Sequence, residues 1–101
     1  MAKTYDPGCG LLEVFPDGAL TVETEGEGRI KLEINVQDLL KMVPGATLSL
    51  ERSGVEIERG RGLSTKHRIG SEEYRVVVGM SVMEFNRGSI MAAWRRAQRH
   101  G

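Results

Sequence analysis

Residues 29–42 read Arg-Ile-Lys-Leu-Glu-Ile-Asn-Val-Gln-Asp-Leu-Leu-Lys-Met, and this stretch decides the class of fold. In its first six residues charged and aliphatic side chains alternate, which predicts a β-strand with one buried and one solvated face. Antiparallel sheets allow such a solvated face. Asn35 then predicts a helix N-cap, with Asp38 near the positive end of the helix. The apolar spacing that follows indicates a short helix, which Pro44-Gly45 ends.

A tight hairpin precedes this strand. Pro16-Asp17-Gly18 lies between two alternating segments, where Pro presets the first turn position and Gly supplies the left-handed one. If Phe15 pairs with Ala19, four apolar residues share one face, so the predicted register is self-consistent. The resulting cross-strand pairs are Val14 with Leu20 and Leu12 with Val22.

The second half of the chain predicts a similar order of strands. Alternation predicts a hairpin of 47–52 with 55–59 around Ser53-Gly54, whose loop has either two or four residues. A further strand is predicted over 73–79. Its three consecutive valines indicate burial on both faces and therefore a central position in the sheet.

The last helix is predicted to begin at Ser81, because Ser81 and Glu84 match the capping box Ser-x-x-Glu. Gly88 weakens this helix, so a break near it is one alternative. Six apolar residues fall within an arc of about 120°: Val82, Met83, Ile90, Ala93, Trp94 and Ala97. Trp94 is therefore expected to anchor the helix on the core and not to hold a ligand.

These segments predict an α+β fold. We expect a single domain over residues 1–101, with a curved antiparallel (or mixed) sheet of about six strands in the order βββ-α-βββ-α. The C-terminal amphipathic helix is expected to pack on the sheet. The two halves have the same predicted order, but residue identity between them is too low to decide whether they are a true repeat.

The charges of the chain are segregated although their total is zero. Residues 1–58 contain 11 acidic and 5 basic residues, a net charge of −6, and residues 59–101 carry +6. Such asymmetry favours an anionic partner or self-association. The boundary falls at the end of a predicted hairpin strand, so both charge blocks are expected to share one core.

The Gly-rich basic segment 59–68 is the first candidate site. Glycines can turn backbone N–H groups toward an anion, hydroxyls add donors, and arginine matches phosphate or carboxylate geometry. The P-loop order is absent, so an unspecialised anion site and a solvated loop without a ligand are the two alternatives. The candidate anion-binding residues are Arg59, Arg61, Ser64, Thr65, Lys66, His67 and Arg68.

The second candidate is the cationic face of the last helix, formed by Arg95, Arg96 and Arg99. Arginines on one face can contact nucleic acid, but they are also what an ordinary amphipathic helix presents to water. An overall pI near 6.7 and an aromatic content of 5% argue against a dedicated nucleic-acid module. Nucleic acid therefore remains a weakly supported partner.

Catalytic and metal-binding patterns are not found in the sequence. Cys9, His67 and His100 match no zinc spacing, so no metal, cofactor or catalytic residue is predicted. A lone cysteine and the lack of a signal or membrane segment favour a cytoplasmic protein that does not contact membranes. The leading hypothesis is a non-catalytic interaction module, either homo-oligomeric or docking on a protein through its separated charges. The alternatives are an anion or nucleic-acid binder and, last, a small enzyme without a recognisable motif.

Overall fold

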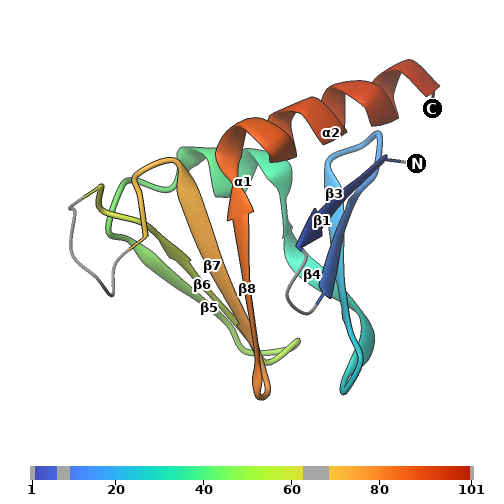
Figure 1. Ribbon diagram of the computed structural model, residues 1–101. Helices are drawn as coiled ribbons and strands as arrows, with labels where there is room; N and C mark the ends of the chain where they lie inside the picture. Colours follow the sequence, from blue (N-terminus) through green and yellow to red (C-terminus); the bar gives the residue numbers. More distant parts are fainter. Residues whose placement is uncertain (1, 7–9, 63–68, 101) are drawn as a thin grey trace.

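The computed structural model describes residues 2–6, 10–62 and 69–100. Within these residues there are eight strands and two helices (Figure 1). The first half contains β1 (Ala2–Asp6), β2 (Gly10–Val14), β3 (Ala19–Thr24), β4 (Gly28–Asn35) and α1 (Val36–Lys41). The second half contains β5 (Thr47–Leu50), β6 (Val55–Arg59), β7 (Glu73–Val78), β8 (Ser81–Asn86) and α2 (Arg87–His100).

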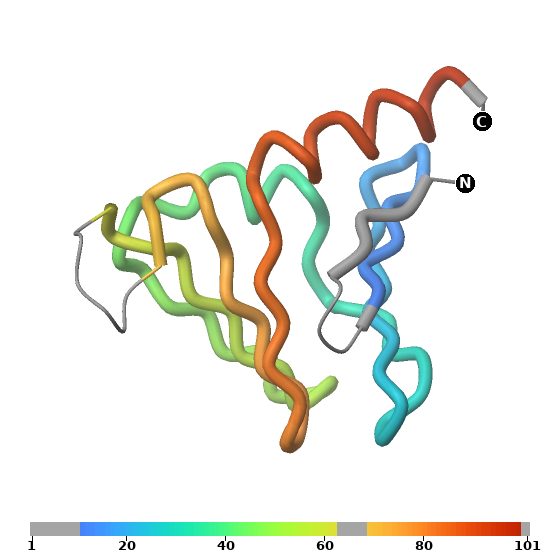
Figure 2. Tube along the Cα trace, in the orientation of Figure 1, coloured from blue at the N-terminus to red at the C-terminus, as the bar shows by residue number. Residues whose placement is uncertain are grey.

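The strands form two antiparallel sheets, each with its strands in sequence order. Sheet A contains β1 to β4 and sheet B contains β5 to β8. Each sheet is followed by a helix, and the long helix α2 runs across the top of the molecule and packs on β1, β2 and β8 (Figures 1 and 2). The prediction of an α+β fold with a C-terminal helix packed on the sheet is confirmed.

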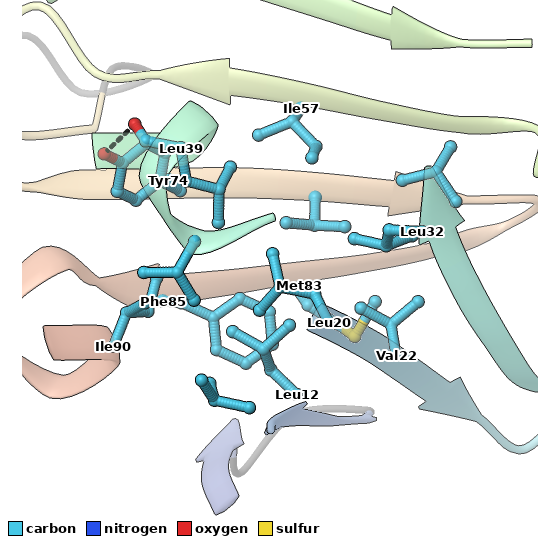
Figure 3. Close-up of a cluster of buried hydrophobic side chains, with 14 of the residues drawn as sticks. Leu12, Leu20, Val22, Leu32, Leu39, Ile57, Tyr74, Met83, Phe85 and Ile90 are labelled. Carbon is cyan, nitrogen blue, oxygen red and sulfur yellow. Dashed lines mark hydrogen bonds between the residues drawn. The ribbon is translucent and has the colours of Figure 1, made fainter. Parts of the chain in front are cut away.

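One hydrophobic core joins both sheets and both helices. Leu12, Leu20 and Val22 of sheet A lie near Met83 and Phe85 of sheet B (Figure 3). The two helices add Leu39 and Ile90, which are also buried. Tyr74 is fully buried, and its hydroxyl donates a 2.6 Å hydrogen bond to the Leu39 carbonyl oxygen, which ties α1 to sheet B. Apolar burial on both sheets therefore supplies the stability that neither sheet has alone.

The predicted hairpin and helix cap of the first half are confirmed. Val14 pairs with Leu20 and Leu12 with Val22, and the backbone N–H of Phe15 bonds to the Ala19 carbonyl. Asn35 caps α1 in a full capping box with Asp38. The second hairpin has the four-residue loop, since Leu50 pairs with Val55. β7 is central in sheet B as expected, although Val77 on its outer face is half-buried and not fully buried.

The predicted start of the last helix is wrong. Residues 81–86 form β8, and α2 begins at Arg87. The reason is that Met83 and Phe85 are buried while their neighbours are exposed, which is the period of a strand paired with β7. Ser81 and Glu84 are equally compatible with such a strand, so their match to the capping box does not mark the start of a helix. The real cap is Asn86, whose Oδ1 accepts hydrogen bonds from the backbone N–H groups of Gly88 and Ser89.

The number of strands also differs from the prediction. β1 was not predicted, and together with β8 it turns each βββ-α half into ββββ-α. The strands divide between two sheets and do not form one curved sheet, because β4 is followed by α1 and β5 begins a new meander. The buried apolar residues of each sheet lie on one face, and these two faces form the shared core.

The two halves repeat the same hydrogen bonds at the junction between the fourth strand and the helix. Asn35 and Asn86 are both helix caps at the ends of their strands. The next residue donates its backbone N–H to the carbonyl that precedes the third strand of its own half. These bonds are Val36 to Gly18 and Arg87 to Glu72, both 2.8 Å. The two halves therefore share the same order of elements and the same junction in the structure.

Candidate functional site

Arg59, the first residue of the basic segment, is buried inside the protein and is only 8% exposed. Its Nε donates to the Ser71 carbonyl oxygen at 2.7 Å, and its Nη1 donates to the Met42 carbonyl oxygen at 2.6 Å. Its Nη2 lies 3.2 Å from a carboxylate oxygen of Glu72. The guanidinium therefore joins three separate parts of the chain, and its three nitrogens are directed at protein acceptors.

The chain leaves and re-enters sheet B through a tight junction beside Arg59. The backbone N–H of Gly60 donates to the Glu73 carbonyl, and the Glu73 carboxylate accepts the N–H of Gly70 at 2.8 Å. Arg61 is exposed, and its side chain passes over Gly45. Five further predicted anion-binding residues lie outside the described residues: Ser64, Thr65, Lys66, His67 and Arg68.

The predicted arginine face of the last helix is present on α2. Ile90, Ala93 and Ala97 are buried beneath the helix. Trp94 is half-buried against the core, and its Nε1 donates to the Pro16 carbonyl oxygen at 3.3 Å, as expected for an anchor. The opposite side exposes three arginines, which we call the basic helix face: Arg95, Arg96 and Arg99. Two of these arginines line an open surface hollow of about 590 Å³ together with Gln98.

The basic helix face forms no ion pair with any described residue, and the acids of the second half of the chain have other partners. Residues 59–101 contain only three acids. Glu72 pairs with Arg59, Glu73 accepts the Gly70 N–H, and Glu84 lies 3.3 Å from Arg75. The positive charge of this face is therefore not neutralised within the part of the chain that the structure describes.

The described parts of the two basic segments do not come together. The end of β6, which carries Arg59, lies on one side of the molecule, and the C-terminal end of α2 lies on the other (Figures 1 and 2). The principal extents of the protein are 39 × 27 × 25 Å. The basic helix face is therefore a surface of its own and not one wall of a site shared with Arg59 and Arg61.

Sheet B carries a negatively charged surface that the sequence did not identify as a site. The outer side of β6, β7 and β8 holds four glutamates around a single arginine, and we call it the acidic sheet face: Glu56, Glu58, Glu73, Glu84 and Arg75. Arg75 pairs across the strands with Glu58 and Glu84, at 4.0 and 3.3 Å. In the sequence, only the alternation of Glu56 and Glu58 indicates this surface. Their neighbours across the sheet include Glu84 on β8, and the sequence predicts a helix and not a strand for residues 81–86.

A carboxylate also joins the two sheets. Glu33 on β4 accepts a 2.7 Å hydrogen bond from the Ser53 hydroxyl and a 3.0 Å bond from the Arg52 backbone N–H. The Ser53 bond is the main reason that the pKa of Glu33 lies below its usual value, with smaller contributions from the backbone. Because the donors belong to the β5–β6 turn, this contact holds the turn against β4.

Ser53→Ala is expected to destabilise the protein more at pH 7 than at pH 3. The folded pKa of Glu33 is lowered, so its stabilising effect is present above the unfolded pKa and is lost as the pH falls through the folded value. Urea unfolding of both proteins at the two pH values measures the difference. An equal loss at both pH values would show that the Ser53–Glu33 bond does not depend on the charged carboxylate. Thr47→Ala, at an exposed position outside this contact, is the control.

Sheet A contains a buried carboxylate and a shallow groove. Glu13 is 1% exposed, and Arg29 Nη2 lies 2.9 Å from its Oε1 as an ion pair without hydrogen-bond geometry. The half-exposed Arg29 therefore compensates the charge of Glu13. A groove of about 440 Å³ on the same face is lined by Phe15, Pro16, Asp17, Ala19, Thr21 and Lys31.

Among the described residues no three His, Cys, Asp or Glu side chains gather where they could hold a metal ion. Neither helix within the described ranges is long and apolar enough to cross a membrane. Comparison of the chain with protein-family models, with curated protein sequences and with solved structures finds no match.

Proposed function

We propose that this protein is a non-catalytic interaction module that docks on an acidic protein surface through its basic helix face, with self-association as the leading case. The observation that carries the proposal is the exposure of Arg95, Arg96 and Arg99 without an ion pair among the described residues. Three guanidinium groups on one helix face form a surface that is complementary to carboxylates. We also propose a cytoplasmic location, because a chain with a single cysteine forms no disulfide within itself and suits a reducing compartment.

The charge balance of the whole chain supports self-association. The net charge is zero, so two copies do not repel one another as they approach. Each copy also carries both a basic and an acidic surface. Contacts between exposed charges are individually weak and are screened by salt, so we expect an association that is strong only at low ionic strength.

Reversal of the basic helix face is expected to weaken this association strongly. The variant Arg95→Glu/Arg96→Glu/Arg99→Glu replaces three positive charges by three negative ones at exposed positions. We expect association at low salt to weaken at least about tenfold, because each rim charge contributes a few tenths to about 1 kcal/mol. Sedimentation velocity at several protein concentrations measures the change.

The matched control is Lys31→Glu/Lys41→Glu/Arg52→Glu, which makes the same change in net charge at three exposed bases outside α2. We expect this control to associate nearly as well as the wild type. If both triple variants lost association equally, net charge and not the basic helix face would be responsible. Circular dichroism of both variants checks that they remain folded.

Nucleic-acid binding is the second candidate function, and the same three arginines favour it. Because the described parts of the two basic segments lie on opposite sides, we expect a duplex to contact the helix alone. Three phosphate contacts predict a slope of about −2.7 for log K against log salt. A mobility-shift titration with mixed-sequence DNA and RNA tests this, and a lack of salt-sensitive binding at low ionic strength would exclude it. Anion binding by Arg61 and the segment after it remains a separate prediction.

A further inference from the structure

We propose that the surface on which the basic helix face docks is the acidic sheet face of a second copy of this chain, so that copies associate head to tail. This inference rests on the proposed function and adds the identity and the location of the partner surface. The basic helix face carries three positive charges, and the acidic sheet face carries four negative charges and one positive charge. The two surfaces therefore have opposite net charges of equal size.

The spacing of the charges on the two surfaces is compatible. Residues three or four apart on a helix have their Cβ atoms about 5–6 Å apart. Neighbouring strands lie about 4.8 Å apart, so charges on β6, β7 and β8 recur at a similar distance across the sheet. Glu58, Arg75 and Glu84 are cross-strand neighbours in one such row. The Arg75 guanidinium lies 4.0 Å from the Glu58 carboxylate and 3.3 Å from the Glu84 carboxylate. An arginine of a second copy, placed on either side of Arg75, would contact one of these two carboxylates.

The acidic sheet face also offers the apolar surface that a stable contact needs. Val77 is half-buried on β7, and its cross-strand neighbour Val82 is 49% exposed. Met80, in the turn between these strands, is fully exposed. The methylene stems of arginine side chains pack on such apolar surface while their guanidinium groups bond to the flanking carboxylates.

The two surfaces lie on different sides of the molecule, so one copy cannot present both of them to the same partner. The C-terminal part of α2 extends over sheet A, where α2 packs on β1 and β2 (Figure 1). The acidic sheet face is the outer side of sheet B, turned away from the core that the two sheets share. The contact is therefore between different surfaces of different copies, which generates rings or open chains and not a closed symmetric pair.

A charge-swap experiment tests this inference. The first variant is the reversed helix face, Arg95→Glu/Arg96→Glu/Arg99→Glu. The second is Thr47→Lys/Ser49→Lys/Glu56→Lys, which replaces one glutamate of the acidic sheet face and adds two lysines beside it on β5. It makes the outer side of sheet B net positive at exposed positions and keeps both ion pairs of Arg75. Each variant alone is expected to associate at least about tenfold more weakly than the wild type. An equimolar mixture is expected to regain association, because the unmutated basic helix face of the sheet variant can then dock on the unmutated acidic sheet face of the helix variant.

The outcomes separate this inference from the proposed function. If the sheet variant associates like the wild type while the helix variant does not, the basic helix face docks elsewhere and the inference is overturned. Loss in both variants without recovery in the mixture also overturns it. If the helix variant keeps full association, the proposed function itself is wrong. Glu56→Lys alone, at an exposed glutamate without an ion pair among the described residues, replaces the triple sheet variant if that variant does not fold.

Discussion

Gly60→Ala is expected to lower the free energy of unfolding by about 3 kcal/mol or more. A Cβ atom at this position would overlap the carbonyl oxygen of Gly70 and would lie 2.7 Å from its carbonyl carbon. These are backbone atoms, so they cannot move aside as the end of a flexible side chain can. They are also held in place, since Gly70 bonds to Glu73 through both its N–H and its carbonyl. Urea or thermal unfolding measures the loss.

Gly26→Ala is the matched control for this prediction. Gly26 lies in the exposed β3–β4 turn, and no atom within 4 Å would meet an added Cβ. We expect a change within about 0.5 kcal/mol. Equal stability of the two alanine variants would contradict the close approach of Gly60 to Gly70, and with it the geometry of the junction beside Arg59.

Arg59→Met is expected to destabilise the protein by about 3 kcal/mol. The substitution keeps an apolar stem of similar length but removes the donors to the Met42 and Ser71 carbonyl oxygens and the ion pair with Glu72. Two partly buried backbone carbonyls then lose charged hydrogen-bond donors, and the contact between Arg59 and the Tyr74 ring is also lost. Chemical unfolding measures this loss as well.

Glu72→Gln separates the contribution of the ion pair from that of the carbonyl bonds. The Glu72 side chain is 62% exposed, so solvent screens its attraction to Arg59 and we expect a loss below about 1 kcal/mol. If Arg59→Met were no more destabilising than Glu72→Gln, Arg59 would not be a structural residue, and its guanidinium would be available for an anion.

The sequence predicted well those elements that depend on neighbouring residues. Asn35 and Asp38 form the expected cap because both partners lie within one helical turn. The hairpin at Pro16-Asp17-Gly18 has the expected register because turn chemistry and apolar alternation agree. Local patterns of this kind need no knowledge of the rest of the fold.

The errors occurred where two local patterns compete or where the partner is distant in sequence. Ser81 and Glu84 match a helix cap, but pairing with β7 decides that they belong to a strand. The structural contacts of Arg59 were also not predicted, because its hydrogen-bond partner Met42 is 17 residues away in the sequence. The acidic sheet face depends on cross-strand neighbours in the same way, whereas the basic helix face was predicted because its residues lie on one helix.

The concentration and salt dependence of the mass of the wild-type protein tests the central claim most directly. Sedimentation equilibrium is measured at about 20 mM salt, where exposed charges are weakly screened, and at about 500 mM salt, where they are almost completely screened. We predict that the mass at low salt rises with concentration well above the 11.1 kDa of one chain, and that it returns to this value at high salt. A mass of one chain at every concentration and at both salt levels would contradict charge-driven self-association.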